Sequence, residues 1–109
     1  MSKYFSKKVE LHGIKFQSKK EGAYYLKLKA LEKSGTIKDL ELQKEYILQD
    51  SFKINKKTRR KISYKADFTY KTTADDKLHI IDVKGFKTDV YMLKKKLFEY
   101  KYGIEIEEV

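Results

Sequence analysis

Two aspartates and a lysine are spaced so that paired strands would bring them together: Asp67, Asp82 and Lys84. Asp67 lies in residues 62–70 and the other two lie in residues 78–84, and both runs are typical of β-strands. Side chains alternate between the faces of a strand, so Asp82 and Lys84 point to the same side. If the strands pair, three charges meet at one place, where they are costly unless they bind a partner such as a divalent cation. This pattern indicates a metal-dependent phosphodiesterase site.

Asp82 and a third acid, Glu21, also have purely structural interpretations. Asp82 and Lys84 on one strand face would form an exposed ion pair, worth under ~1 kcal/mol. A further acid, Glu21, follows Ser18 by three residues, and Ser-X-X-Glu is a capping box that binds the start of a helix. The capping box therefore predicts that the Glu21 carboxylate binds the N-terminus of this helix. His79 is predicted to be an ordinary strand residue.

The composition narrows the class of protein. A length of 109 residues predicts one domain over residues 1–109, and 40% hydrophobic with 14% aromatic residues predicts a globular chain. The absence of cysteine excludes disulfides and thiolate metal sites, and two histidines are too few for most zinc sites. No run reaches the length of a membrane span, and residues 1–4 lack the start of a signal peptide. We therefore expect a cytoplasmic protein with no membrane partner.

The charge indicates a polyanionic partner, of which nucleic acid is the commonest. The net charge is +10, and residues 53–65 hold seven basic residues and no acid. The alternative is a solvated surface that only keeps the protein soluble. The basic side chains predicted to contact nucleic acid are Lys57, Arg59, Arg60, Lys61 and Lys65, together with Lys87, Lys94 and Lys95 further along.

The first third of the chain predicts a hairpin and a helix. The hairpin joins residues 9–11 to residues 14–16 through His12 and Gly13, since glycine suits the positive φ of a two-residue turn. The helix begins after Ser18 as N-cap and ends before Gly35. Its predicted core positions are Ala23, Leu26, Ala30 and Leu31.

The rest predicts three strands, a helix and a last strand. The strands are residues 40–48, 62–70 and 78–84, with a polar turn over residues 49–55. A second helix begins after Thr88 as N-cap and ends at Gly103, and residues 104–107 alternate as an edge strand. Since a helix separates the last two strands, we expect these two to be parallel. The predicted core stripe of the second helix is Val90, Leu93, Leu97 and Tyr100.

This order of elements and these motifs resemble the PD-(D/E)XK nuclease superfamily, and more narrowly a family of small phage-encoded proteins within it. The motifs that carry the resemblance are Gly13-Ile14-Lys15-Phe16, Ser18-Lys19-Lys20-Glu21, Tyr64-Lys65-Ala66-Asp67-Phe68 and Asp82-Val83-Lys84-Gly85-Phe86. The resemblance implies an α/β (α+β) fold with a restriction-endonuclease-like αβββαβ core: a mixed central sheet flanked by helices, here after an N-terminal hairpin. One departure is Ala66, where the superfamily motif has proline.

The resemblance also implies a role for each site residue. Asp67 and Asp82 would be carboxylate ligands of one Mg²⁺, with Mn²⁺ as a substitute, and the backbone carbonyl of Val83 would complete the set. Lys84 would lie beside the attacking water and the scissile phosphate. Glu21 matches an acid that many members aim at the metal. Gln43 stands where some relatives have a polar active-site residue.

Together these features predict a Mg²⁺-dependent endodeoxyribonuclease of a phage or prophage, acting in the cytoplasm of a bacterial host. A chain this short has little room for base reading, so selectivity for branched or junction DNA is expected. Cutting two strands symmetrically would require a homodimer. Two alternatives stay open: a non-catalytic basic nucleic-acid-binding module, and a nuclease-like subunit that needs a protein partner.

Overall fold

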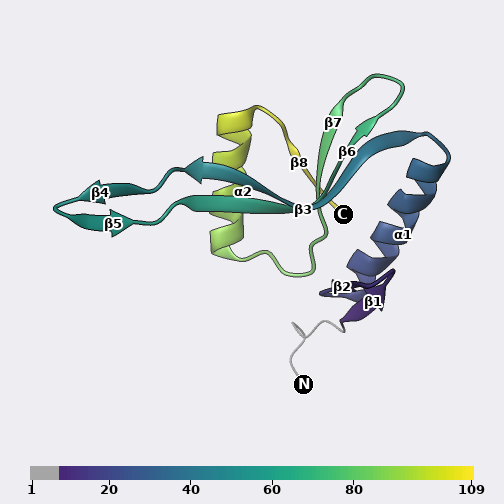
Figure 1. The fold of residues 1–109 in the computed structure, drawn as a ribbon, viewed down its shortest axis with the longest axis horizontal. Helices are drawn as coiled ribbons and strands as arrows, with labels where there is room; N and C mark the ends of the chain where they lie inside the picture. The colour runs from purple at the N-terminus through teal and green to yellow at the C-terminus, as the bar shows by residue number, and fades with distance from the viewer. Residues whose placement is uncertain (1–7) are drawn as a thin grey trace.

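The computed structural model describes residues 8–109. The prediction that residues 1–4 lack the start of a signal peptide therefore lies outside the described residues. The fold is mixed α and β, with two helices and a mixed sheet (Figure 1). Neither helix of the described part is long and apolar enough to cross a membrane. The elements are β1 (Val9–Leu11), β2 (Ile14–Phe16), α1 (Lys19–Lys33), β3 (Ile37–Gln49), β4 (Phe52–Ile54), β5 (Lys57–Arg59), β6 (Ile62–Thr72), β7 (Leu78–Asp82), α2 (Asp89–Tyr102) and β8 (Ile106–Glu108).

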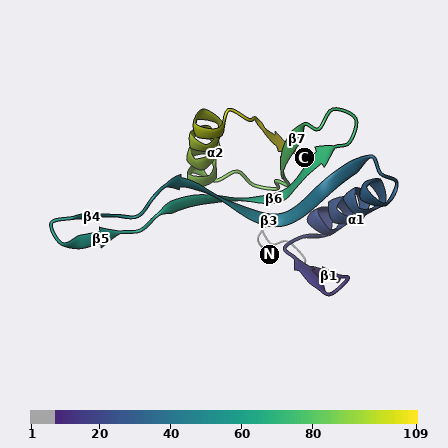
Figure 2. The same cartoon turned by 45° about the horizontal axis from the view of Figure 1, so that its top comes forward.

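The main sheet has the strand order β3-β6-β7-β8. β3 pairs antiparallel with β6, and β6 with β7, whereas β7 and β8 are parallel, which confirms the expectation drawn from the intervening helix. The helices cover opposite faces of the sheet (Figure 2). Ile80 and Ile81 are neighbours on β7 and so point to opposite faces; Ile80 packs in the core of α2 and Ile81 in that of α1.

The predicted turn and cap residues are confirmed. His12 and Gly13 have φ of 53° and 77°, the left-handed pair that a tight hairpin turn needs. Ser18 and Thr88 are the N-caps, and each side chain accepts a hydrogen bond from the backbone N–H three residues later. Gly103 ends α2 with φ of 68°, a conformation that costs glycine nothing.

The predicted core face of α1 is confirmed at Leu31, which packs against the core, and is wrong at the other three positions. Its buried face carries Tyr25 and Leu28, whereas Leu26 is 44% exposed and Ala23 is also exposed. Tyr25 contacts the rings of Phe16 and Phe68, so aromatic packing against the hairpin and the sheet sets the rotation of the helix. Periodicity alone does not identify the face that meets the larger rings.

The predicted core stripe of α2 is wrong for the same reason. Tyr91 and Phe98 are the buried residues of this helix, and both pack in one core with Tyr64. The predicted stripe faces solvent instead, with exposures from 40% to 90%. Its members are Val90, Leu93, Leu97 and Tyr100.

The polar turn predicted over residues 49–55 is also wrong. The segment continues as a second hairpin, β4 and β5, which turns at Asn55 and Lys56. These two residues have φ of 49° and 64°. Asparagine tolerates the left-handed conformation, whereas lysine rarely adopts it, so the sequence carried only half of the usual turn signal. The hairpin leaves the body of the protein as a long arm (Figures 1 and 2).

Candidate active site

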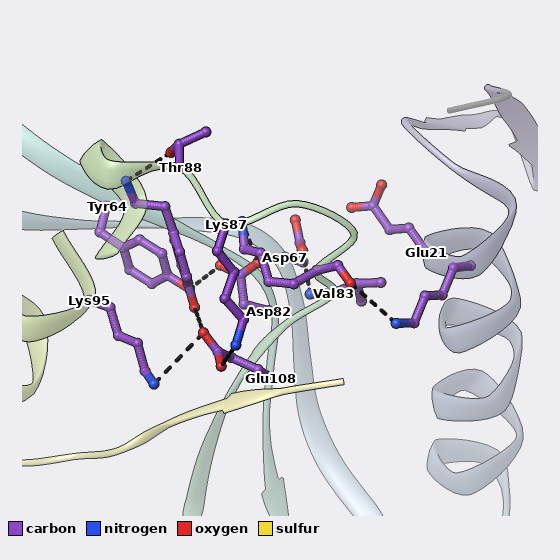
Figure 3. A network of polar contacts seen from close by, with 12 residues as sticks. Glu21, Tyr64, Asp67, Asp82, Val83, Lys87, Thr88, Lys95 and Glu108 are labelled. Atoms are coloured by element: carbon purple, nitrogen blue, oxygen red, sulfur yellow. Dashed lines mark hydrogen bonds and ion pairs between the residues drawn. The ribbon is translucent and has the colours of Figure 1, made fainter. Parts of the chain in front are cut away.

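The two aspartates lie on neighbouring strands. The register that pairs Phe68 with Ile81 places Asp67 beside Asp82 at its next step. The Oδ2 atom of Asp67 accepts a hydrogen bond of 2.7 Å from the backbone N–H of Val83. Figure 3 shows Asp67, Asp82 and Val83 grouped together, with Glu21 reaching toward them from α1. The strands thus bring the predicted pair of carboxylates to one place.

Asp82 is almost fully enclosed, with 2% of its surface exposed. Its Oδ2 atom accepts a hydrogen bond of 2.6 Å from the Tyr64 hydroxyl. Its Oδ1 atom is buried and accepts no hydrogen bond from the described residues, although the Lys84 ammonium forms an ion pair with it at 2.9 Å. Buried polar atoms normally have partners, and the partner of this oxygen is the Lys84 charge.

Lys84 is held in place by the surrounding structure. The strand β7 ends at Asp82, two residues earlier than predicted, and beyond it the Lys84 N–H donates to the Val109 carbonyl at 3.1 Å. The Lys84 ammonium lies 3.9 Å from the centroid of the Tyr91 ring and its side chain is 23% exposed. A cation in this position is attracted by the face of the ring. The ion pair with Asp82 is therefore largely enclosed, unlike the exposed pair of the structural interpretation.

Glu21 both caps α1 and faces the site. Its backbone N–H donates to the Ser18 hydroxyl at 3.1 Å, and its Oε1 atom accepts from the Gln17 N–H at 2.9 Å. Its Oε2 atom lies 3.4 Å from the Nε2 atom of Gln43. Glu21 is 5% exposed; one carboxylate oxygen serves the start of the helix and the other is turned toward β3.

Gln43 connects the acids of the helix and the sheet. Its Nε2 atom also lies 3.3 Å from Oδ1 of Asp67, so one amide bridges Asp67 and Glu21. The backbone of Gln43 has φ of 55°, a conformation that costs a residue with a Cβ roughly 1–2 kcal/mol. Strained backbone of this kind is concentrated at functional sites. The structure therefore gives Gln43 a stronger connection to the site than its sequence position indicated.

Burial raises the pKa of both aspartates above the ordinary carboxyl value. For Asp67 desolvation is the largest cause and the nearby charge of Glu21 adds to it. For Asp82 desolvation again dominates, while the Tyr64 hydroxyl and Lys84 act in the opposite direction. Both carboxylates thus lie where negative charge is unfavourable. A bound cation would relieve that cost.

No three acidic or histidine side chains among residues 8–109 stand close enough to hold one ion as they are arranged. These acids contact other side chains instead. Lys84 occupies the position beside Oδ1 of Asp82, and the Gln43 amide stands between Asp67 and Glu21. Both side chains would have to turn aside before the three carboxylates could share a cation.

The aspartates open into a shallow pocket of about 240 Å³. Its wall includes Lys65 from β6 and Lys94 from α2, so two of the predicted nucleic-acid contacts flank the acids. The full lining is Tyr64, Lys65, Asp67, Asp82, Lys84, Thr88, Val90, Tyr91 and Lys94. A larger cavity of about 520 Å³ lies near His79 and Gly103, and it contains none of these acids.

The other predicted nucleic-acid contacts fall into two groups. Lys57 and Arg59 lie on β5, and Arg60 and Lys61 follow them at the base of the arm. Lys87 and Lys95 lie close to Glu108, at 2.9 and 3.7 Å, so part of their charge is neutralised within the protein. Glu108 could not be singled out from the sequence, because its partners come from α2 and the segment before it.

Two tyrosines belong to the site although the sequence assigned them no such role. Tyr64 donates to Asp82, and Tyr91 lies under Lys84 and donates to Glu108 at 2.7 Å. Burial and the adjoining carboxylates raise the pKa of both hydroxyls, so they remain proton donors. Tyr64 and Asp82 are eighteen residues apart, and no local sequence signal joins them.

Comparison with known proteins adds one result. No curated protein and no solved structure matches the sequence. The model of one family matches residues 1–107, and its description is "Protein of unknown function (DUF1064)". The chain therefore belongs to the DUF1064 family.

Proposed function

We propose that this protein is a Mg²⁺-dependent endodeoxyribonuclease that hydrolyses phosphodiester bonds of DNA. The observation that carries the proposal is the juxtaposition of Asp67 and Asp82, two desolvated carboxylates on neighbouring strands with Lys84 held beside them. A protein that kept these acids only for stability would gain little from them, because the desolvation of a buried carboxylate can exceed what its hydrogen bonds and ion pairs return.

The order of elements supports a restriction-endonuclease-like core of the PD-(D/E)XK type. Without the two hairpins, the chain runs α1, β3, β6, β7, α2, β8 with a mixed sheet between the helices, in agreement with the αβββαβ order. The acids fall at corresponding places, Asp67 within the second of these strands and Asp82 at the end of the third. β4 and β5 are then an insertion between the first and second core strands.

The residues present fit a divalent cation. Oδ1 of Asp82 is a buried carboxylate oxygen that already draws a cation, the Lys84 ammonium at 2.9 Å, and magnesium prefers anionic oxygen ligands of this kind. Asp67, Asp82 and the Val83 carbonyl would hold the ion, with Glu21 aimed at it from α1. When bound, Mg²⁺ neutralises charge on the phosphate and lowers the pKa of water.

The protein's own residues would position the substrate and stabilise charge. Lys84, fixed between Asp82 and the Tyr91 ring, would place its ammonium next to the phosphate as negative charge develops there. Lys65 and Lys94 at the pocket wall would bind neighbouring phosphates. Tyr64 would keep Asp82 in one orientation through its 2.6 Å hydrogen bond.

Branched or junction DNA of a phage is the proposed substrate, because phosphate contacts are plentiful and base-reading elements are few. A homodimer would supply the second active site that symmetric cleavage needs. The exposed stripe on α2 supports such an interface, since Val90, Leu93, Leu97 and Tyr100 alternate at three- and four-residue spacing, as in helix pairs. The bacterial cytoplasm is the proposed compartment.

A second candidate function, from another class, is a non-catalytic nucleic-acid-binding module. The observation in its favour is that Lys84 already neutralises Asp82 and that three carboxylates do not converge among the described residues. A nuclease-like subunit that is activated by a protein partner is intermediate between the two, since the partner would rearrange Lys84 and Gln43.

The test is incubation with linear, nicked, flapped and four-way DNA, with and without Mg²⁺ or Mn²⁺. We expect cation-dependent cutting of a branched substrate, lost in Asp82→Asn while salt-sensitive binding is retained. If the wild-type protein binds DNA but cuts none of these substrates with either cation, the binding module is favoured. Cutting that begins only when a host extract is added would indicate the partner-dependent subunit.

A further inference from the structure

The arm formed by β4 and β5 is the most basic and least covered part of the described structure. Every residue from 49 to 62 is exposed. Residues 50–61 hold six basic residues and one acid, so their net charge is 6 − 1 = +5, half of the +10 of the whole chain. Of the six, Lys61 alone forms an ion pair within residues 8–109, with Glu45 at 3.3 Å. The basic residues are Lys53, Lys56, Lys57, Arg59, Arg60 and Lys61.

One face of the arm alternates apolar and cationic side chains. In its antiparallel register Phe52 lies opposite Arg59, and Ile54 lies opposite Lys57. Residues directly opposite each other share a face, so these four side chains lie together. Phe52 and Ile54 are 46% and 50% exposed, which is costly unless the face meets a partner.

The arm is continuous with the strand that carries Asp67. From Asn55 at the tip to Asp67 the chain advances 12 residues. At ~3.3 Å a residue this is a reach of about 40 Å. The longest dimension of the molecule is 53 Å, and the arm forms one end of it (Figure 1). Duplex DNA rises ~3.4 Å per base pair, so the tip would lie about 12 base pairs from a phosphate at Asp67.

We infer that the arm binds duplex DNA in a groove about one helical turn from the bond that is cut. A two-stranded ribbon fits the major groove, and its cations reach the phosphates on either side. The inference rests on the proposed function for the position of the scissile bond, but the binding itself does not depend on cleavage. If the arm binds in this way, the DNA substrate must contain at least one turn of duplex on one side of the cleavage site.

The test variant removes three arm cations: Lys56→Gly, Lys57→Gln and Arg59→Gln. Glycine suits position 56, where φ is 64°, so the turn is retained. The matched control removes three cations outside the arm, by Lys27→Gln, Lys33→Gln and Lys77→Gln. Binding is measured in EDTA, where no cutting occurs, on duplexes of about 8 and about 24 base pairs, since only the longer one spans the estimated reach.

On the long duplex, we expect the arm variant to lower the slope of log affinity against log salt by about 2.7, at ~0.9 per phosphate contact. Wild type then loses about 40-fold more affinity than the arm variant between about 0.05 and about 0.2 M salt. The short duplex can occupy the arm or the active site but not both at once, so the slope should differ less between the two proteins there. The control variant should resemble wild type on both.

An unchanged slope on the long duplex, with a folded variant by circular dichroism, would overturn the inference. So would an arm variant that changes from dimer to monomer in sedimentation, which would make the arm an interface between copies. Absence of cleavage by wild type would count against the proposed nuclease only, because the binding comparison in EDTA stands without it.

Discussion

Tyr64→Phe isolates the hydrogen bond that holds Asp82. The substitution removes one hydroxyl from a buried ring and leaves the carboxylate enclosed without its 2.6 Å donor. Hydrogen bonds to charged groups contribute about 1.5–3 kcal/mol to stability, and the Lys84 ion pair at Oδ1 is already present in the wild-type protein, so it does not replace the lost donor at Oδ2. We therefore expect the free energy of unfolding at pH 7 to fall by about 2 kcal/mol.

The loss should depend on pH in a defined direction. The Tyr64 hydrogen bond lowers the pKa of Asp82, so it favours the ionised carboxylate. Above the pKa of Asp82 the full loss is seen, and below it the protonated carboxyl loses only a neutral hydrogen bond, worth about 1 kcal/mol. Urea unfolding of wild type and variant at several pH values between about 4 and about 8 measures this difference.

Tyr91→Phe is the matched control. Its hydroxyl donates to Glu108 at 2.7 Å, but that carboxylate also pairs with Lys87 at 2.9 Å and is more exposed. Its loss should be under ~1 kcal/mol. Equal losses for the two variants, or a Tyr64→Phe loss that does not change with pH, would refute the account of Asp82 as a desolvated charge.

Three further predictions concern the acids, the strained glutamine and the exposed stripe. Asp67→Asn should stabilise the protein at pH 7 and abolish cutting. Because the pKa of Asp67 is raised in the folded state, the folded wild-type protein binds more protons than the unfolded chain, and its stability falls as the pH rises from the ordinary carboxyl pKa through the raised one. The stability advantage of the variant should therefore vanish in acid. Urea unfolding should give Gln43→Gly a free energy of unfolding about 1 kcal/mol higher than that of Gln43→Ala, because both variants lack the amide and only glycine relieves the φ of 55°. Equal free energies of unfolding would show that the backbone of Gln43 is not strained. Leu93→Glu with Leu97→Glu should make a sedimenting dimer monomeric, and an unchanged mass would exclude this stripe as the interface.

Local signals in the sequence were sufficient for the elements that carry the acids. Ser18 and Thr88 can bond the N–H three residues ahead wherever the chain goes, so the starts of both helices were predictable. The runs around Asp67 and Asp82 are typical of strands, and the helix before β8 favoured a parallel pairing with β7, which the structure has. The juxtaposition of the two acids followed from these local facts.

Features that depend on distant partners were not predictable in this way. The rotations of α1 and α2 are set by rings elsewhere in the chain, such as Phe68 beside Tyr25 and Tyr64 beside Phe98. The stripe on α2 has a core-like spacing and yet faces solvent, since no described element covers it. The Gln43 bridge depends on a left-handed residue within a strand, which glutamine does not signal.

The arm was missed because its turn lacks glycine and its strands are highly charged. Residues 50–61 contain two large apolar residues, Phe52 and Ile54, and six cations, a composition typical of a loop. Continuation of β3 and β6 into the arm gives these short strands the support that an isolated hairpin lacks. The basic run is evident in the sequence, whereas the extension of this segment away from the body of the protein is evident only from the fold.

Cation binding tests the central claim most directly. Calorimetric titration with Mn²⁺ should give saturable binding to the wild-type chain, lost in Asp67→Asn and in Asp82→Asn and retained in Lys77→Gln. Mn²⁺ should raise the melting temperature of the wild-type protein but not that of Asp67→Asn or Asp82→Asn, as mass action requires when only the folded state binds the ion. Wild-type protein that binds no divalent cation with DNA present, or variants that bind it as well as wild type, would contradict the claim that Asp67 and Asp82 form a metal site.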